Sequence, residues 1–212
     1  MPAAIVEALL PSRCLACAQP SSSHFCAVCG EQIEPSSSPS SPSSSFLYLG
    51  PLAGVIRRAK YGRDVAVARG LASWWRAQLV DVDAAAVTFV PAHWTRRLLR
   101  GFDLPALLAS AVAGPARPLV EVLVARRRDP RLAEAASAEQ RALIVAGRFT
   151  VRSPERIGAL AGQRVVVVDD VHTTGATLAE ACRVIEAAGL VPVPLPLAIT
   201  PLRSAPVADA PR

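Results

Sequence analysis

The segment 165–177, which reads VVVVDDVHTTGAT, constrains the fold of this chain more than any other. Four consecutive valines without polar alternation predict a strand that is covered on both faces, and such strands are usually parallel. After Thr177, apolar residues recur at helical spacing as far as Ala188, and Gly189 follows where a helix would end in a left-handed turn. The segment therefore predicts a strand, a turn and a helix in succession.

The turn between this strand and this helix has the composition of an anion-binding site. A helix start offers unpaired backbone N–H groups and the positive end of the helix dipole. Thr173, Thr174 and Thr177 add hydroxyls, and Gly175 lets the main chain approach a ligand closely. Hydrogen bonds to a charged group contribute about 1.5–3 kcal/mol each, against about 0.3–1 kcal/mol from the dipole. We therefore expect a phosphate monoester held mainly by hydroxyls and amides.

Two neighbouring acids, Asp169 and Asp170, are expected at the carboxyl end of the strand, the edge at which open α/β sheets bind ligands. Carboxylates accept hydrogen bonds well from vicinal hydroxyls, so the expected ligand is a ribose 5-phosphate. An acid pair in a loop can instead be merely solvated or hold a metal ion. The buried strand before the pair and the anion-binding turn after it favour the sugar phosphate.

The stretch Val167–Thr177 resembles the 5-phosphoribosyl-1-pyrophosphate (PRPP) binding motif of the type I phosphoribosyltransferases. The resemblance implies an α/β fold with a parallel sheet. It also implies that Asp169 and Asp170 hold the ribose hydroxyls, and that Mg²⁺ sits with the pyrophosphate and ribose oxygens. The turn at Pro91 and Ala92, followed by His93 and Trp94, corresponds to the place where that family binds pyrophosphate. The implied 5-phosphate loop consists of Thr173, Thr174, Gly175, Ala176 and Thr177.

Two C-x-x-C pairs lie near the amino terminus, Cys14 with Cys17 and Cys26 with Cys29. This is the spacing of a zinc knuckle, and four thiolates around one Zn²⁺ leave no open position, so such a site would be structural. Disulfides are the alternative. We see no secretory signal in the first residues and expect a cytoplasmic protein, where thiols stay reduced. His24 lies between the pairs, and we expect it to be a solvated loop residue.

The composition divides the chain into three parts: a zinc-knuckle segment at 1–34, a linker at 35–45 and a phosphoribosyltransferase-like domain at 46–212. The linker is almost entirely serine and proline, so we expect it to be flexible and to bury nothing. The chain has 212 residues, enough for one α/β domain with a small appendage. It is 51% hydrophobic but has no apolar run of membrane length, which indicates a soluble protein without a membrane span.

A zinc knuckle in front of a phosphoribosyltransferase motif resembles the ComF family, bacterial proteins linked to DNA uptake in competence. The resemblance also includes Lys60–Asp64, Phe89–His93, Arg100–Phe102 and the pair Gln140-Arg141. This chain departs from the family pattern on the acceptor side. Asp103-Leu104 stands where the family has Asn-Gln, Ile144 stands where it has Asn, and Pro130 and Ala133 stand where it has a Thr/Gln pair.

Helical spacing predicts helices over 51–61, 67–79 and 98–112, and apolar runs predict strands over 84–90 and 119–124. Residues 135–144 are expected to be helical or mobile. Alternation of strands and helices predicts a parallel sheet with right-handed crossovers. Pro192, Pro194 and Pro196 lack backbone donors, so we expect 191–199 to be at best an edge strand. Trp74 and Trp75 point about 100° apart on a helix, so one of them is expected in the core, and Cys182 is expected to be a buried small hydrophobe.

The formal net charge is +6, and Lys60 is the only lysine. Arginines gather at 96, 97 and 100 and again at 126, 127, 128 and 131. Their planar forks suit either a pyrophosphate or a nucleic-acid backbone. The leading hypothesis is Mg²⁺-dependent transfer of a phosphoribosyl group from PRPP to a nitrogen acceptor. The alternative is a non-catalytic DNA-uptake protein that binds single-stranded DNA or a helicase-like competence partner.

Overall fold

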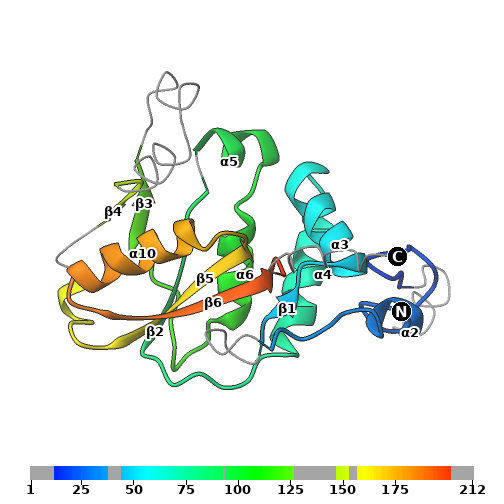
Figure 1. The fold of residues 1–212 in the computed structure, drawn as a ribbon, viewed down its shortest axis with the longest axis horizontal. Helices are drawn as coiled ribbons and strands as arrows, with labels where there is room; N and C mark the ends of the chain where they lie inside the picture. Colours follow the sequence, from blue (N-terminus) through cyan, green and yellow to red (C-terminus); the bar gives the residue numbers. More distant parts are fainter. Residues whose placement is uncertain (1–11, 38–43, 93, 127–146, 153–156, 202–212) are drawn as a thin grey trace, which may run out of the picture.

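A computed structural model describes residues 12–37, 44–92, 94–126, 147–152 and 157–201 (Figure 1). Its centre is a parallel sheet of four strands in the order β1-β6-β5-β2. A separate antiparallel pair is formed by β3 and β4. The strands are β1 (Phe46–Leu47), β2 (Ala86–Phe89), β3 (Leu123–Ala125), β4 (Phe149–Val151), β5 (Arg164–His172) and β6 (Val191–Ile199). The helices are α2 (Ala27–Gly30), α3 (Gly50–Tyr61), α4 (Val65–Arg76), α5 (Trp94–Arg100), α6 (Leu104–Val112) and α10 (Ala176–Ala187).

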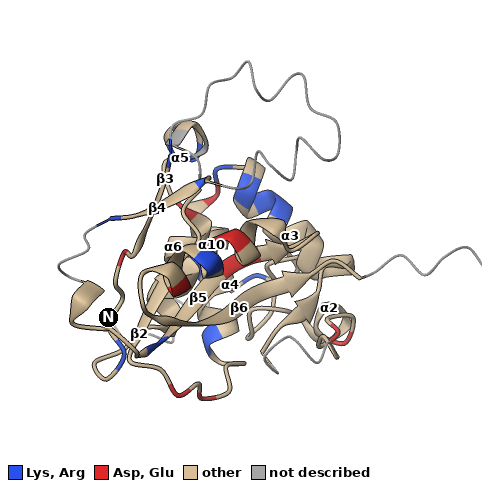
Figure 2. Ribbon diagram, turned by 60° about the vertical axis from the view of Figure 1, so that its left-hand side comes forward, with Lys and Arg blue, Asp and Glu red and all other residues tan. Residues whose placement is uncertain are grey.

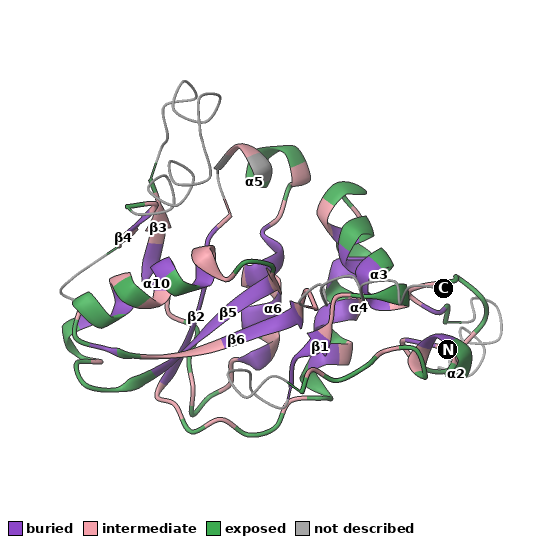
Figure 3. Ribbon diagram, in the orientation of Figure 1, coloured by how far each residue is buried: buried purple, intermediate pink, exposed green. Residues whose placement is uncertain are grey.

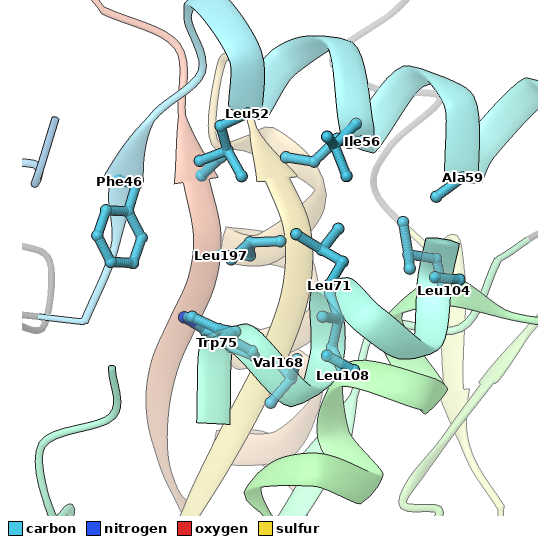
Figure 4. Packing of buried hydrophobic residues seen from close by; sticks show 14 of the residues in the cluster. Phe46, Leu52, Ile56, Ala59, Leu71, Trp75, Leu104, Leu108, Val168 and Leu197 are labelled. Atoms are coloured by element: carbon cyan, nitrogen blue, oxygen red, sulfur yellow. The ribbon is translucent and has the colours of Figure 1, made fainter. Parts of the chain in front are cut away.

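The valine run forms the interior strand β5, as its composition predicts. All four valines are fully buried, and they alternate between two hydrophobic clusters on opposite faces of the sheet (Figure 3). Val166 and Val168 pack with α3, α4 and α6, where Leu52, Leu71 and Leu108 lie (Figure 4). The other two valines face α10 and the β3–β4 pair. Burial on both faces holds the carboxyl end of β5 rigidly in the middle of the sheet.

Strand β6 lies between β5 and β1, but among the described residues it pairs with β1 only at its last two residues. The expectation of an edge strand at 191–199 is therefore confirmed for the stretch that carries the prolines and wrong for the carboxyl end of the strand. The Val191 amide donates to the carbonyl oxygen of Gln163, the residue just before β5. Alternate backbone amides face opposite neighbours, so the prolines at the even positions 192, 194 and 196 direct their missing donors away from β5. On that other side, β1 pairs only with Ala198 and Ile199, beyond the last proline.

Two further expectations are corrected. The helix expected over 98–112 is broken into α5 and α6 at Gly101, whose φ of 80° is incompatible with a continuing helix. The strand expected over 119–124 is β3 at Leu123–Ala125, which pairs antiparallel with β4 and lies outside the main sheet, while Leu119 makes only an isolated bridge to Val87. Residues 135–144 lie outside the described residues.

Our expectation that the segment 35–45 buries no residue is wrong at its carboxyl end. Ser44 and Ser45 are both completely buried. Ser44 O accepts a hydrogen bond of 2.8 Å from Trp75 Nε1, and Ser45 Oγ donates one of 2.6 Å to Pro196 O. These bonds attach the carboxyl end of the serine/proline segment to α4 and β6. Residues 38–43 lie outside the described residues, and the division of the chain into three parts stays a prediction.

The cysteine segment packs against α3 and α4. Phe25 lies edge-on to Trp74 with ring centroids 5.1 Å apart, and Arg58 Nη1 donates to Leu15 O at 3.0 Å. Trp75 is fully buried, as expected for one of the two tryptophans. Cys182 is half-buried against the second cluster. Among the described residues, no helix has the length and apolar character needed to cross a membrane.

Candidate ligand-binding site

The acid pair lies at the carboxyl end of β5, in the interior of the molecule. Asp169 and Asp170 are 8% and 7% exposed. The Asp170 amide donates to Asp169 Oδ1 at 2.9 Å, and Lys60 Nζ lies 2.7 Å from Asp170 Oδ1. Burial, and then the negative charge of Asp170, raise the pKa of Asp169 to about 8, although Lys60 and Arg148 lower it in part. Near neutral pH the pair therefore holds one proton, and a cation or a donor-rich ligand would favour its full ionisation.

The turn after β5 brings backbone and hydroxyl groups to the same end of the sheet. Gly175 has a φ of 79° and precedes the first residue of α10. A Cβ there would lie 2.8 Å from the imidazole of His172, so the left-handed backbone favours glycine and a larger residue would displace the His172 ring. At the start of α10, Thr177 Oγ1 and Arg148 Nη1 are 3.2 Å apart. The turn thus combines a helix start with a guanidinium, a combination suited to a phosphate.

These groups line one cavity of about 290 Å³. Its lining combines the acids and phosphate-loop residues with cationic and aromatic side chains from other elements. Figure 2 shows the basic residues of α3 in blue near this end of the sheet. Arg100 lies over the Tyr61 ring, with its guanidinium carbon 5.5 Å from the ring centroid. The polar lining comes from Tyr48, Lys60, Tyr61, Arg100, Arg148, Asp169, Asp170, His172, Thr173 and Thr177, and Pro91, Ala92 and Gly175 also line the cavity.

A buried acid, Asp103, holds the turn that follows β2. Pro91 and Ala92 line the cavity, and the Ala92 amide donates to Asp103 Oδ2 at 3.0 Å. Arg97 Nε is 3.9 Å from the same oxygen. Burial raises the pKa of Asp103, and the Ala92 amide and Arg97 oppose that rise. Oδ1 is buried and has no partner within the described part of the chain. Asp103, noted in the sequence only as a departure from a family pattern, therefore anchors the Pro91–Ala92 turn.

The structure brings together most of the residues expected in the ligand site. Asp169, Asp170, Thr173, Gly175 and Thr177 line the cavity. Thr174 and Ala176 line an adjacent apolar depression between α10 and β6 instead. His93 and Arg127, Arg128 and Arg131 lie outside the described residues, as do Pro130, Ala133, Gln140, Arg141 and Ile144.

Sequence reasoning assigned no role in the site to four contributors, namely Lys60, Tyr61, Arg148 and Asp103. Lys60 and Tyr61 precede the acid pair by more than a hundred residues, and their helix was expected only as an amphipathic one. Two signals pointed to Lys60: its place in the segment Lys60–Asp64, which is part of the family resemblance, and its being the only lysine in the chain.

The four cysteines form a second polar cluster, away from the cavity. Their Sγ atoms all lie within 4.8 Å of one another, and those of Cys17 and Cys26 are 3.7 Å apart. Burial raises the pKa of Cys14, but the backbone amides of Cys17, Cys26 and Ala16 outweigh it and lower the value to about 6. Burial, then hydrogen bonds from the other cysteines, raise the pKa of Cys29 to about 12. The cluster could hold a metal ion, and His24 is not part of it.

Part of the chain is similar to a known protein family. Residues 98–194 match the family model described as the phosphoribosyl transferase domain. A search of the curated proteins found no match. The family match covers the acid pair and the whole turn after it, and it begins within α5.

Three solved structures are similar to parts of the chain. One is an allosteric regulatory enzyme of purine biosynthesis, at 25% identity and a TM-score of 0.40 over 61% of this chain. Another is the glutamine PRPP amidotransferase of B. subtilis, at 24% identity and a TM-score of 0.41 over 64% of this chain. A third is the orotate phosphoribosyltransferase of Mycobacterium tuberculosis H37Rv, at 17% identity and a TM-score of 0.33 over 65% of this chain. The alignments span 25%, 29% and 61% of those proteins. The chain is therefore an α/β protein with a parallel sheet, and its residues 98–194 are similar to the phosphoribosyl transferase domain.

Proposed function

We propose that the cavity binds 5-phosphoribosyl 1-pyrophosphate with Mg²⁺ and that the protein transfers the phosphoribosyl group to a nitrogen acceptor. One observation carries the proposal: Asp169 and Asp170 line the same cavity as Thr173, Gly175 and Thr177. Carboxylates that accept from a diol and a helix start that donates to a phosphate are the two recognition elements of a ribose 5-phosphate. Their presence in a single hollow supports one ligand rather than two.

The residues of the cavity also fit the reaction. In the transfer, the bond from C1 of the ribose to the pyrophosphate oxygen breaks, and a bond from C1 to the acceptor nitrogen forms, after which the nitrogen loses a proton. Positive charge develops on the sugar, and the carboxylates of Asp169 and Asp170 stabilise it while they hold the hydroxyls. Arg100 and Arg148 line the cavity and offset the charge of the departing pyrophosphate. Mg²⁺ would be bound chiefly through ligand oxygens and would neutralise the same leaving group.

Calorimetric titration with PRPP and Mg²⁺ tests the binding step. The wild-type protein is expected to bind, and Asp170→Asn to bind about tenfold to a hundredfold more weakly, because hydrogen bonds to a charged group contribute about 1.5–3 kcal/mol. Asp83→Asn is the matched control, since the Asp83 side chain is 96% exposed and distant from the cavity lining. Absence of binding by the wild-type protein, or equal affinities for the wild type and Asp170→Asn, would refute the proposal. Release of pyrophosphate with candidate amine and base acceptors then tests turnover.

We further propose that the cysteine cluster binds one structural Zn²⁺. Zn–S bonds of about 2.3 Å in a tetrahedron place the sulfurs about 3.8 Å apart. The 3.7 Å separation of the Cys17 and Cys26 sulfurs agrees with that edge, and four sulfurs complete the coordination. Such an ion would hold the cysteine segment against α3 and α4 and take no part in the transfer.

Membership of the ComF family, a cytoplasmic location and a partnership with single-stranded DNA or a helicase-like protein stay predictions from the sequence. Of the second arginine cluster, only Arg126 lies within the described residues, where it is exposed. Single-strand DNA affinity that falls steeply between 50 and 200 mM salt would favour the DNA-uptake alternative.

A further inference from the structure

One cation reaches the acid pair from a distant part of the chain. Lys60 lies in the last turn of α3, and its Nζ is 2.7 Å from Asp170 Oδ1. The side chains of Lys60 and Asp170 are only 18% and 11% exposed, so water screens this pair less than it screens a surface salt bridge. The match to the phosphoribosyl transferase domain begins at residue 98. Lys60 is therefore supplied by a segment that precedes the matched domain.

Lys60 is held in place by its helix. Leu52, Val55, Ile56 and Ala59 of α3 are buried in the cluster that also contains Val168 of β5. The last turn of a helix carries the negative end of the dipole, which favours a cation there. The buried face of α3 therefore fixes the position of the Lys60 ammonium group beside Asp170.

The contact with Lys60 determines which carboxylate oxygens are engaged. Within the described residues, the hydrogen bonds and ion pair of the two acids use Oδ1 of each: Lys60 contacts that of Asp170, and the Asp170 amide donates to that of Asp169. Oδ2 of each aspartate takes part in neither of these contacts. These two oxygens on adjacent residues match the two hydroxyls of a vicinal diol, with one hydroxyl for each acid.

Charge points the same way. Two adjacent carboxylates repel each other and also repel a ligand that carries phosphate groups. The other charged or titratable groups that face the pair or line its cavity are Arg148 before β4, Arg100 of α5, His172 at the end of β5, Asp103 before α6, and the phenols of Tyr48 and Tyr61. Of these cations, Lys60 alone is shown in direct contact with a carboxylate of the pair within the described residues. It offsets the negative charge of Asp170.

We propose that Lys60 is a positioning residue that fixes Asp170 by one oxygen, so that the acid pair selects a vicinal diol. This inference rests on the proposed function of the cavity. Lys60 acts through Asp170 and does not itself need to touch the sugar. Its removal would leave Asp170 free to rotate and would restore the repulsion within the pair.

Binding of two sugar phosphates tests the inference. Ribose 5-phosphate carries the diol, and 2-deoxyribose 5-phosphate lacks one hydroxyl of it. Lys60→Met is expected to weaken binding of ribose 5-phosphate by about tenfold or more, since a hydrogen bond to a charged group is lost to the site. It is also expected to reduce the preference for ribose over deoxyribose, whereas Lys60→Arg retains much of that preference. Arg57→Met, an exposed cation of the same helix, is the control and leaves both values unchanged.

A second measurement does not depend on affinity. Lys60 is the only lysine in the chain, so reductive methylation with ¹³C-formaldehyde labels this side chain and the α-amino group. The Lys60 resonance is expected to move in Asp170→Asn and to stay in place in Asp83→Asn. It is also expected to move when ribose 5-phosphate is added to the wild-type protein.

The outcomes separate the two proposals. If the wild type binds ribose 5-phosphate and Asp170→Asn does not, but Lys60→Met keeps the wild-type affinity and diol preference, the inference about Lys60 is wrong and the proposed function stands. If the wild type binds neither sugar phosphate nor PRPP, both fail. A Lys60 resonance that does not respond to Asp170→Asn also overturns the inference.

Discussion

The protein contains two polar clusters, the four cysteines and the cavity at the end of β5. They differ in whether a single ion could satisfy all of their groups. The cysteine cluster consists of four identical groups whose sulfurs lie within 4.8 Å of one another, so a single cation would satisfy all of them. The cavity at the end of β5 combines acids, cations and hydroxyls around about 290 Å³ of space. A closed set of ligands around one ion suits a permanent structural role, whereas an open set of mixed donors and acceptors suits a ligand that enters and leaves.

The largest expected effect concerns the closed cluster. Cys17→Ser removes one exposed sulfur and is expected to abolish stoichiometric Zn²⁺ binding. It should also lower the free energy of unfolding by on the order of 4 kcal/mol, because loss of a structural metal is among the most destabilising changes. Metal analysis and urea denaturation measure the two effects. Cys182→Ser, the fifth cysteine, is the control. Equal metal content and stability in the two variants would show that the cluster is not a metal site.

The acid pair in the cavity at the end of β5 should make the free energy of unfolding depend on pH. The pKa of Asp169 is raised to about 8, well above its usual value, mainly by burial. The folded state therefore holds a proton that the unfolded state loses at lower pH, so the free energy of unfolding falls as pH rises between about 4 and 8. Each pH unit in that window costs up to about 1.4 kcal/mol. Urea denaturation at several pH values measures this slope, and Asp169→Asn is expected to flatten it. An identical slope in the variant would contradict the prediction.

Much of this arrangement could be predicted from the sequence, because the governing signals are local. Four valines, two acids and a threonine/glycine turn adjoin in the chain, so the strand β5, the helix α10 and their shared edge follow from periodicity. The cysteine cluster follows from its spacing in the same way.

What could not be predicted depends on contacts between distant segments. Nothing local indicates that Lys60 reaches Asp170, or that Asp103 accepts the Ala92 amide. The three prolines of β6 correctly indicate a side with little pairing, but nothing local predicts that β1 pairs with the last two residues of the strand. Burial of Ser44 and Ser45 likewise requires Trp75 and Pro196 to be in place.

A glycine pair tests whether the open cluster depends on its turn in particular. Gly175 and Gly189 flank the same helix, α10, and both have a φ near 80°, at 79° and 82°. Alanine at either position is expected to cost about 1–2 kcal/mol of stability through the left-handed backbone alone. Only at Gly175 would the new Cβ meet the His172 ring, at 2.8 Å, while at Gly189 nothing lies within 4 Å. Ribose 5-phosphate affinity should therefore fall in Gly175→Ala and persist in Gly189→Ala. Equal ribose 5-phosphate affinities in the two variants would show that ligand binding does not depend on the turn at Gly175.

The smallest expected effect concerns Asp103, which supports the cavity without lining it. Asp103→Ala leaves the Ala92 amide without its acceptor and should cost about 1 kcal/mol of stability. Asp103→Asn keeps a carbonyl oxygen for that amide and removes a charge whose Oδ1 has no described partner, so its stability should match or exceed that of the wild type at neutral pH. Thermal denaturation of both variants measures the difference. If Asp103→Asn is as destabilised as Asp103→Ala, the charge itself supports the Pro91–Ala92 turn through Arg97, and the open cluster then extends to that ion pair.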